Sequence, residues 1–232
     1  MNDLQTNWSD ETLTKLPLFA RLSRIEREHL AASLVPRGYR RGEALFHEGD
    51  PGDALHILTS GQVKVFLTTP DGEEAVVALL GPGDICGELA IFDDLPRSAS
   101  VIALEATETL ALHRQNFHAF LRAHPEVVSE VLAVLAGRIR RLDEQLKQTY
   151  FMDLPYRLSR KLLELSADRG HRTPQGIRID VPLTQSDLAS MVGASRQRVN
   201  RILAELRDKQ VIRLERRGLT ILKPEYFEEG NG

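Results

Sequence analysis

The feature of this sequence that most constrains its fold is a change in hydrophobic period near residue 125. Before it, residues 38–112 place short apolar runs between nine glycines. After it, apolar residues recur at alternating intervals of three and four along residues 132–146. The first pattern is typical of strands joined by tight turns, and the second of one face of a helix. A chain of 232 residues is long enough for two domains. We therefore predict an α+β protein in which a strand-rich domain, residues 1–124, comes first.

The strand-rich domain is predicted to be a small antiparallel barrel or roll. Pro70-Asp71-Gly72 indicates a turn, because proline presets its own φ and glycine accepts a positive φ. Many short strands with glycine-rich turns favour this architecture. The expected strands are Ala54–Leu58, Val63–Leu67, Ala75–Leu80, Ser100–Ala103 and Thr109–Leu112.

The periodic stretch predicts a long helix that begins after Pro125. It should end near Asp153-Leu154-Pro155, since the residue before a proline disfavours helical backbone. The apolar seam is narrow and charged residues such as Arg138 flank it, which favours a two-stranded coil between subunits. The alternative is a helix packed on its own domain. We predict that residues 125–153 form a dimerisation helix and hinge, with an interface made by Leu132, Leu135, Ile139, Leu142 and Leu146.

Residues 183–206 carry the most specific pattern in the chain. Thr184 followed by Asp187 is a helix start of the capping-box type. Gly193 then indicates a tight turn, and Ser195 is a second N-cap. Two short helices joined by a glycine turn form a helix-turn-helix. The second helix is expected to expose side chains whose donors and acceptors suit the base edges of DNA, namely Arg196, Gln197, Arg198, Asn200 and Arg201.

A local excess of basic charge accompanies this segment. Between Val181 and Lys223 there are nine basic and four acidic residues, a net charge of +5. Because the whole chain carries −3, the remainder carries −8. A basic module on an otherwise acidic chain indicates a polyanion site, and nucleic acid is the candidate partner.

Two strand-like runs follow the second of these helices. Val211–Leu214 and Leu219–Leu222 flank Arg216 and Arg217, as in a hairpin wing that places basic side chains beside phosphates. The alternative is an αα-hairpin with a solvated basic face and no DNA partner. We predict that residues 154–232 form a winged helix-turn-helix domain that binds double-stranded DNA.

The other informative segment is Gly83–Phe92, with Arg97-Ser98-Ala99 shortly after it. Gly87 allows the backbone to approach a ligand closely, and N–H groups at the start of a short helix can receive an anion. Arg97 offers a charged, planar partner for phosphate. Glu88 can accept hydrogen bonds from sugar hydroxyls. On these residues alone, a charged surface loop is the alternative.

The chain resembles the cyclic-AMP receptor protein and fumarate–nitrate regulator family of bacterial transcription factors over roughly residues 15–223. The resemblance rests on GELAIFDDLPRSA in the first domain and LTQSDLASMVGASRQRVNRIL in the second, with the coiled-coil helix between them. The first motif is similar to the phosphate-binding cassette of cyclic-nucleotide domains, and the second to the family's helix-turn-helix. The resemblance implies a cyclic-nucleotide-binding β-roll, a long dimerisation helix and a winged helix-turn-helix. It also implies a homodimeric activator or repressor of transcription controlled by cyclic AMP.

The resemblance also implies roles for individual residues of the ligand site. Glu88 would hold the ribose 2′-hydroxyl, and Arg97 and Ser98 the cyclic phosphate. In family members that respond to cyclic AMP, polar residues of the dimer helix contact the adenine. Here those positions read Leu142-Asp143, of which only Asp143 can accept a hydrogen bond from the adenine amino group. The implied ligand set is Gly87, Glu88, Leu89, Arg97, Ser98, Ala99 and Asp143.

For the DNA domain, the resemblance implies that Arg196 and Arg201 reach guanines of a TGTGA-like half-site. Gln197 stands where the enteric-type protein has Glu, and Gln suits adenine whereas Glu accepts from cytosine N4. We therefore expect a different or relaxed preference at that base pair. The loop Asp168–Gly176 corresponds to a region that often touches RNA polymerase in family members. The implied DNA-binding set is Thr184, Ser195, Arg196, Gln197, Arg198, Asn200, Arg201, Arg216 and Arg217.

The rest of the sequence argues against other classes of protein. The single cysteine, Cys86, cannot supply an iron–sulfur site, and seven histidines without close pairing do not suggest haem or metal. No nucleophile elbow, Walker loop or complete dinucleotide fingerprint is present, so we expect no enzyme. No apolar run approaches 18 residues, so we expect a cytoplasmic protein without a membrane partner. Within the family, the alternative is a DNA binder that needs no ligand and keeps a vestigial cassette.

Overall fold

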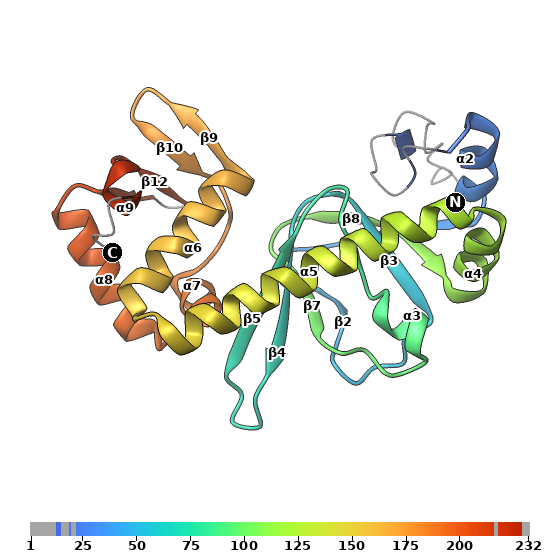
Figure 1. Cartoon of the computed structure of the whole chain (residues 1–232), viewed down its shortest axis with the longest axis horizontal. Coiled ribbons are helices and arrows are strands. Elements are labelled where there is room, and N and C mark those ends of the chain that lie inside the picture. Colours follow the sequence, from blue (N-terminus) through green and yellow to red (C-terminus); the bar gives the residue numbers. More distant parts are fainter. Residues whose placement is uncertain (1–12, 15–18, 20–21, 216–217, 229–232) are drawn as a thin grey trace. The chain divides into compact units, whose positions relative to one another are not determined.

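A computed structural model of the chain describes residues 13, 14, 19, 22–215 and 218–228 (Figure 1). These residues fall into two units. The first contains the described residues up to 67 together with residues 78–139, and the second contains residues 68–77 and those from 140 onwards. Among the described residues, no helix is both long enough and apolar enough to cross a membrane.

Eight strands, which lie almost entirely in the first unit, form two four-stranded sheets. One sheet has the order β1-β8-β3-β6 and the other β2-β7-β4-β5. The β1–β8, β8–β3 and β3–β6 pairings are antiparallel, as are β2–β7 and β7–β4. The strands are β1 (Leu34–Tyr39), β2 (Ala44–Phe46), β3 (Ala54–Ser60), β4 (Val63–Thr68), β5 (Glu74–Leu80), β6 (Ile85–Cys86), β7 (Ser100–Ala103) and β8 (Thr107–His113). The predicted roll and its five expected strands are confirmed.

Glycines with positive φ shape several turns of the roll, as Gly72 and Gly61 illustrate. Gly72 has φ of 83° in the hairpin between β4 and β5, which confirms the turn predicted there. Gly61, between β3 and β4, has φ of 78°. A Cβ atom on Gly61 would lie 2.4 Å from Oγ1 of Thr107, so that β8 can approach this turn only because the side chain is absent.

Within the described part of the first unit, four helices with defined bounds cover or extend the roll. They are α2 (Arg24–Ala31), α3 (Leu89–Asp93), α4 (Arg114–Ala123) and the first part of α5 (Pro125–Phe151). Val127 and Val131 of α5 share one buried cluster with Leu55 of β3 and Leu110 of β8 (Figure 1). This burial of apolar surface holds the start of α5 on the sheet that contains β3 and β8.

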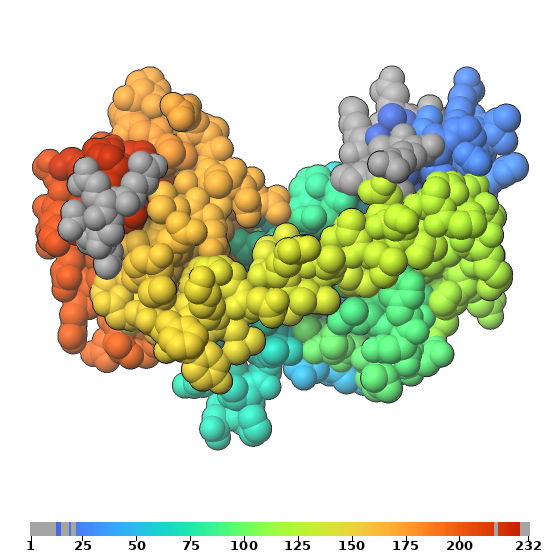
Figure 2. All heavy atoms as spheres, in the orientation of Figure 1, coloured from blue at the N-terminus to red at the C-terminus, as the bar shows by residue number. Residues whose placement is uncertain are grey.

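The 27-residue helix α5 begins at Pro125, where proline is favoured because its missing N–H needs no partner in the first turn. It ends at Phe151, close to the predicted break. The next helix, α6 (Leu154–Arg169), begins at once, because the Asp153 side chain caps it by accepting from the Tyr156 N–H at 3.0 Å. Figure 2 shows the side chains of α5 uncovered along one side of the helix.

The remaining elements belong to the second unit. Strands β9 (Gly170–Thr173), β10 (Gly176–Ile179), β11 (Ile212–Leu214) and β12 (Leu219–Ile221) form a sheet in the order β11-β12-β10-β9. Helices α7 (Gln185–Met191), α8 (Arg196–Asp208) and α9 (Glu225–Glu228) complete the unit. The core includes Leu158 and Leu162 of α6 and Val199 and Leu203 of α8. This arrangement confirms the predicted winged helix-turn-helix fold.

Candidate functional site

The cassette Gly87–Ala99 connects β6, α3 and β7 in the first unit. The backbone of Arg97 is tied to the loop after β2, because its N–H donates to the Asp50 carbonyl and its carbonyl accepts from the Gly49 N–H, both at 2.9 Å. These two bonds fix the backbone of Arg97 and therefore the position from which its side chain extends.

The guanidinium group of Arg97 is buried and only partly satisfied. Its Nη1 donates to the Gly87 carbonyl at 2.7 Å and its Nη2 to the Ala54 carbonyl at 2.6 Å. The Nε atom is buried and has no hydrogen-bond partner. Burial lowers the pKa of Arg97, because desolvation penalises the charged form. An anion bound beside this group would offset that penalty.

The carboxylate of Glu88 is also buried and only partly satisfied, and the residue is only 2% exposed. One carboxylate oxygen forms an ion pair with Arg138 of α5, and Arg138 also donates to the Ile85 carbonyl. The other oxygen, Oε2, is buried without a partner. In the sequence, Arg138 is recognisable only as a charged flank of the seam. No local spacing could have revealed the pair, since the two residues are 50 positions apart.

Two glycines allow the cassette to close around Arg97. Gly87 has φ of 79°, and a Cβ atom there would lie 2.3 Å from Nη1 of Arg97. A Cβ atom on Gly52 would lie 2.3 Å from Cβ of Ala90 and 3.3 Å from Cζ of Arg97. The group closest to Gly87 is thus the Arg97 side chain of the same cassette, and the close approach of a ligand stays a prediction.

The other predicted ligand residues are less enclosed. Leu89 and Ser98 are exposed, and Ala99 is half-buried. Asp143 is exposed and belongs to the second unit. The structure thus brings Gly87, Glu88 and Arg97 together with Arg138.

The chemistry offered by this site is recognition of a polar anion. A buried cation with a free N–H donor suits an anionic oxygen, and a buried carboxylate with a free oxygen suits a hydroxyl donor. Burial raises the pKa of the neighbouring Cys86 thiol to about 12, so it is not poised as a nucleophile. Among the residues that the structure describes, His, Cys, Asp and Glu form no cluster of three or more that could hold a metal ion.

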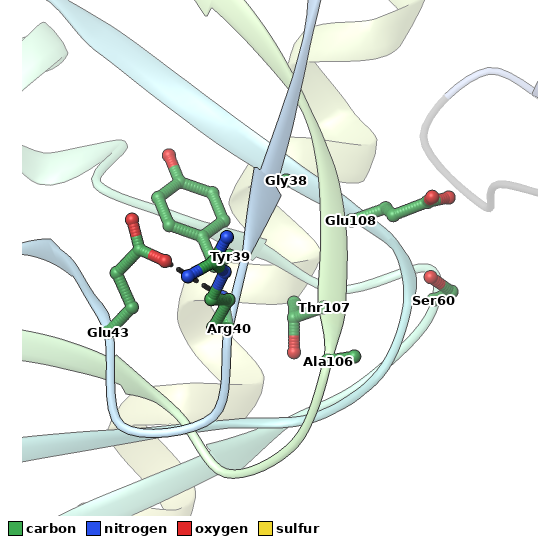
Figure 3. A pocket seen from close by; sticks show the side chains of 8 residues that line it. All are labelled: Gly38, Tyr39, Arg40, Glu43, Ser60, Ala106, Thr107 and Glu108. Atoms are coloured by element: carbon green, nitrogen blue, oxygen red, sulfur yellow. Dashed lines mark hydrogen bonds between the residues drawn. The ribbon is translucent and has the colours of Figure 1, made fainter.

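A separate hollow in the first unit contains none of the predicted ligand residues. It is open to solvent and is lined by Gly38, Tyr39, Arg40, Glu43, Ser60, Ala106, Thr107 and Glu108. The Arg40 N–H donates to Glu43 at 2.8 Å across the loop that bounds it (Figure 3). This contact is a local turn interaction, and we assign no ligand to the hollow.

In the second unit, the helix-turn-helix is built by the caps that the sequence indicated. Thr184 Oγ1 accepts from the Asp187 N–H at 3.1 Å, and Asp187 Oδ2 accepts from the Thr184 N–H at 2.8 Å, which completes a capping box. Gly193 adopts φ of 61° in the turn, and Ser195 caps α8 by accepting from the Arg198 N–H at 3.4 Å. These caps fix where α8 begins and hence which side chains it exposes.

Helix α8 exposes Arg196, Gln197, Arg198 and Arg201 as predicted. The expected exposure of Asn200 is wrong: the residue is half-buried, and its Oδ1 has no hydrogen-bond partner. At about 100° per residue, position 200 lies about 60° around the helix from the buried position 203, so it stands at the edge of the buried face. Arg216 and Arg217 lie outside the described residues.

The apolar seam of α5 is largely open to solvent. Leu132 and Ile139 are each 59% exposed, and Leu142 and Leu146 are also exposed. Leu135 differs, because it is half-buried and packs against the core cluster of its own unit. The structure therefore agrees in part with each interpretation of the sequence. Leu135 packs on the core of its own unit, and the other four seam residues remain exposed to solvent.

A β-roll with a buried Arg–Glu cassette and a separate winged helix-turn-helix define a class of transcription regulators. The model of the cyclic nucleotide-binding domain matches residues 36–124, and that of the Crp-like helix-turn-helix domain matches residues 156–229. The chain belongs to the Crp-like family of transcription regulators, whose members are not enzymes.

Three similar proteins illustrate this relationship. The CRP-like cAMP-activated global transcriptional regulator of Mycobacterium tuberculosis is 35% identical over 91% of this chain and 95% of its own. The cyclic AMP receptor protein of Thermus thermophilus is 36% identical over 85% and 88%. A c-di-GMP responsive global regulator of Xanthomonas campestris has a similar structure, with a TM-score of 0.77 and 21% identity over 86% of this chain and 99% of its own. The last of these is a likeness of fold alone.

Proposed function

We propose that this protein is a homodimeric, sequence-specific DNA-binding regulator of transcription in the cytoplasm, and that cyclic AMP bound in the β-roll controls its affinity for DNA. The observation that carries the ligand assignment is the pair of buried polar atoms without partners, Nε of Arg97 and Oε2 of Glu88. The names of the two curated relatives, which describe a cAMP-activated regulator and a cyclic AMP receptor, support it.

A cyclic nucleotide carries the two groups that could serve as partners for these buried atoms. Its cyclic phosphate carries one negative charge for Arg97, and its ribose 2′-hydroxyl is a donor for Glu88. Each buried polar group left unpaired costs about 1–3 kcal/mol, and charge-assisted hydrogen bonds are the stronger kind. A ligand that satisfies both groups at once therefore gains more than one that satisfies either alone.

We assign recognition of the nucleotide base to residues of α5. Leu142 offers no hydrogen bond, whereas the exposed carboxylate of Asp143 can accept from the exocyclic amino group of adenine. Guanine also carries an exocyclic amino group, so an acceptor by itself selects weakly between the two bases. The experiment below therefore compares cyclic AMP with cyclic GMP.

On the DNA side, two α8 helices of a dimer would enter successive major grooves about 34 Å apart in a near-palindromic site. Arg196 and Arg201 are assigned to guanines of a TGTGA-like half-site, and Gln197 to an adjacent base pair with an altered preference. The region Asp168–Gly176, which contains β9 and the turn into β10, is the candidate contact for RNA polymerase.

The link between ligand and dimer runs through Arg138. This residue lies on α5, which carries the seam, and its guanidinium pairs with the Glu88 carboxylate that would receive the ligand hydroxyl. Binding at Glu88 therefore changes the surroundings of a residue on the dimer helix. Control of DNA binding follows if cyclic AMP binds more tightly to the DNA-competent state than to the other.

One observation favours a second candidate function, a DNA-binding regulator that needs no ligand. Both Nη groups of Arg97 already donate to backbone carbonyls, and Glu88 already has a cationic partner in Arg138. A cassette stabilised from within in this way can persist as a structural element.

The experiment that separates the two candidates is a calorimetric titration of the nucleotide-stripped dimer with cyclic AMP and with cyclic GMP, followed by DNA-binding measurements with and without nucleotide. We expect saturable binding selective for cyclic AMP and tighter DNA binding in its presence. Arg97→Gln should abolish most of the heat, whereas Arg122→Ala, an exposed position of α4, should not. Normal DNA binding without any nucleotide binding would support the ligand-independent function instead.

A further inference from the structure

We propose that Phe46 is a positioning residue of the anion site: its ring holds the guanidinium of Arg97 in the orientation that leaves Nε free for the ligand. This inference rests on the proposed function for the identity of the ligand. It adds a residue that lies in β2, outside the cassette and outside every motif considered above.

The contact itself is a cation–π interaction. Cζ of Arg97 lies 4.2 Å from the centroid of the Phe46 ring, well within the range of about 6 Å over which such contacts are attractive. The guanidinium is buried, so the attraction is not weakened by solvent as it would be at a surface.

The neighbouring atoms leave the guanidinium little freedom around this contact. Its Nη1 and Nη2 donate to the carbonyls of Gly87 and Ala54. The space beside Gly87 is filled by both side chains, since a Cβ atom there would lie 2.3 Å from Nη1 of Arg97 and 3.3 Å from Cε1 of Phe46. Each Nη already donates one hydrogen bond to a backbone carbonyl, whereas Nε is the guanidinium nitrogen that has no partner.

The position of the Phe46 ring is itself fixed by the sheet. Phe46 pairs with Val101 of β7, and the register of β2 and β7 shifts between Ala44 and Phe46. Such an irregularity re-aims the side chain that follows it. The ring also packs against the buried cluster that contains Val101 and Cys86. These contacts hold the half-buried ring in place beside Arg97.

The imidazole ring of His56, which also lies against Phe46, is electrically neutral. The His56 ring centroid lies 5.9 Å from that of Phe46, and its Nδ1 is 3.2 Å from Oγ1 of Thr109. Burial, reinforced by the charge of Arg97, lowers the pKa of His56 to about 4. At neutral pH the His56 imidazole therefore does not compete with Arg97 as a cation for the Phe46 ring.

The chain offers a matched control for this contact. Phe66 of β4 also carries a cation over its ring, with Nζ of Lys64 4.9 Å from the centroid, and it lies in the same sheet as Phe46. Phe66→Leu therefore removes a comparable ring and a comparable cation–π contact without touching Arg97.

The test measures cyclic AMP affinity by calorimetry and, independently, the Nε–Hε resonance of Arg97 in ¹⁵N-resolved NMR spectra of the ligand-free dimer. The resonance is assigned by its loss in Arg97→Gln. Phe46→Leu should weaken binding about 2- to 30-fold, the range equivalent to a contact of this kind. It should also move the Arg97 resonance, which loses the shielding of the ring. Phe46→Tyr should preserve both values, and Phe66→Leu should change neither.

Two results would overturn the inference: an unchanged resonance and affinity in Phe46→Leu, or an equal loss in Phe46→Tyr and Phe66→Leu. Absence of cyclic AMP binding by the wild-type protein would instead refute the ligand assignment. In that case the Arg97 resonance alone decides whether Phe46 positions the guanidinium, so the two failures are distinguishable.

Discussion

The carboxylate of Glu88 and the guanidinium of Arg138 form an ion pair that joins the cassette to α5, with its acidic member almost completely buried. Taking a carboxylate out of water is costly, and a buried pair is favourable only while both partners are present. Loss of the cation leaves an uncompensated buried charge.

Removal of Arg138 should therefore destabilise the protein strongly. We expect Arg138→Ala to lower the free energy of unfolding by about 3 kcal/mol, as measured by urea denaturation. Arg141→Ala, at an exposed position of the same helix, is the control and should change it little. The double variant Glu88→Gln/Arg138→Gln should recover part of the loss, because it buries no unpaired charge. Equal stability of Arg138→Ala and wild type would contradict this account of the pair.

The exposed seam of α5 predicts the effect of a charge placed on it. Ile139→Glu should convert the dimer to a monomer, because two carboxylates would face each other across a desolvated interface. Since Ile139 is 59% exposed within one chain, the fold of the monomer should persist. Sedimentation velocity checks the change in mass. Arg141→Glu, off the seam, should remain dimeric, and a dimeric Ile139→Glu would place the subunit interface elsewhere.

Substitution of Arg201 should separate base recognition from phosphate contact. Arg201→Ala should cost about 1–3 kcal/mol on a duplex with the matched guanine and little on a duplex in which that base pair is changed. Arg207→Ala is the control on the same helix, because Arg207 pairs with Asp208 at 2.9 Å. Fluorescence anisotropy on the two duplexes measures the difference. An equal loss on both would mean that Arg201 contacts phosphate only.

The buried imidazole of His56 predicts a pH dependence of stability. Burial, with the charge of Arg97 as the next cause, lowers the pKa of His56 to about 4 in the folded protein, whereas the unfolded chain binds the proton near pH 6.5. The unfolded state therefore holds more protons between these values, and stability falls as the pH is lowered through them.

From this group alone, the free energy of unfolding should decrease by about 3 kcal/mol between pH 7 and pH 4. Urea denaturation at a series of pH values gives the curve, and His56→Gln isolates the contribution because glutamine can still reach Oγ1 of Thr109 without titrating. Parallel curves for the two proteins would show that His56 is not the group responsible.

The sequence predicted the strands best where hydrophobic alternation and glycine turns both mark the boundaries, as in β3, β4, β5, β7 and β8. It did not indicate β1, β2 or β6. Strand β6 has only two residues, and β1 contains Pro36 and Gly38, which are unfavourable in strands. These strands form because neighbouring strands offer unpaired backbone groups, and that information is not local.

The residues of the candidate site likewise divide into those with a local sequence signal and those without one. Glu88, Arg97 and the caps Thr184 and Ser195 could be found because each stands in a short motif whose residue types carry the chemistry. Arg138 could not, since it meets its partner only through the packing of α5 on the roll. Asn200 was misplaced because residue type suggested a base contact, whereas the helical period turns it partly inwards.

The burial of Cys86 has a practical consequence. It is the chain's one sulfhydryl, and burial that raises its pKa to about 12 keeps it unreactive at neutral pH. A cysteine introduced at an exposed residue such as Gln175 would thus be labelled alone, without prior removal of the native one. The proposed homodimer would then carry two identical probes, and the separation between their spin labels would follow the β9–β10 hairpins as nucleotide is added.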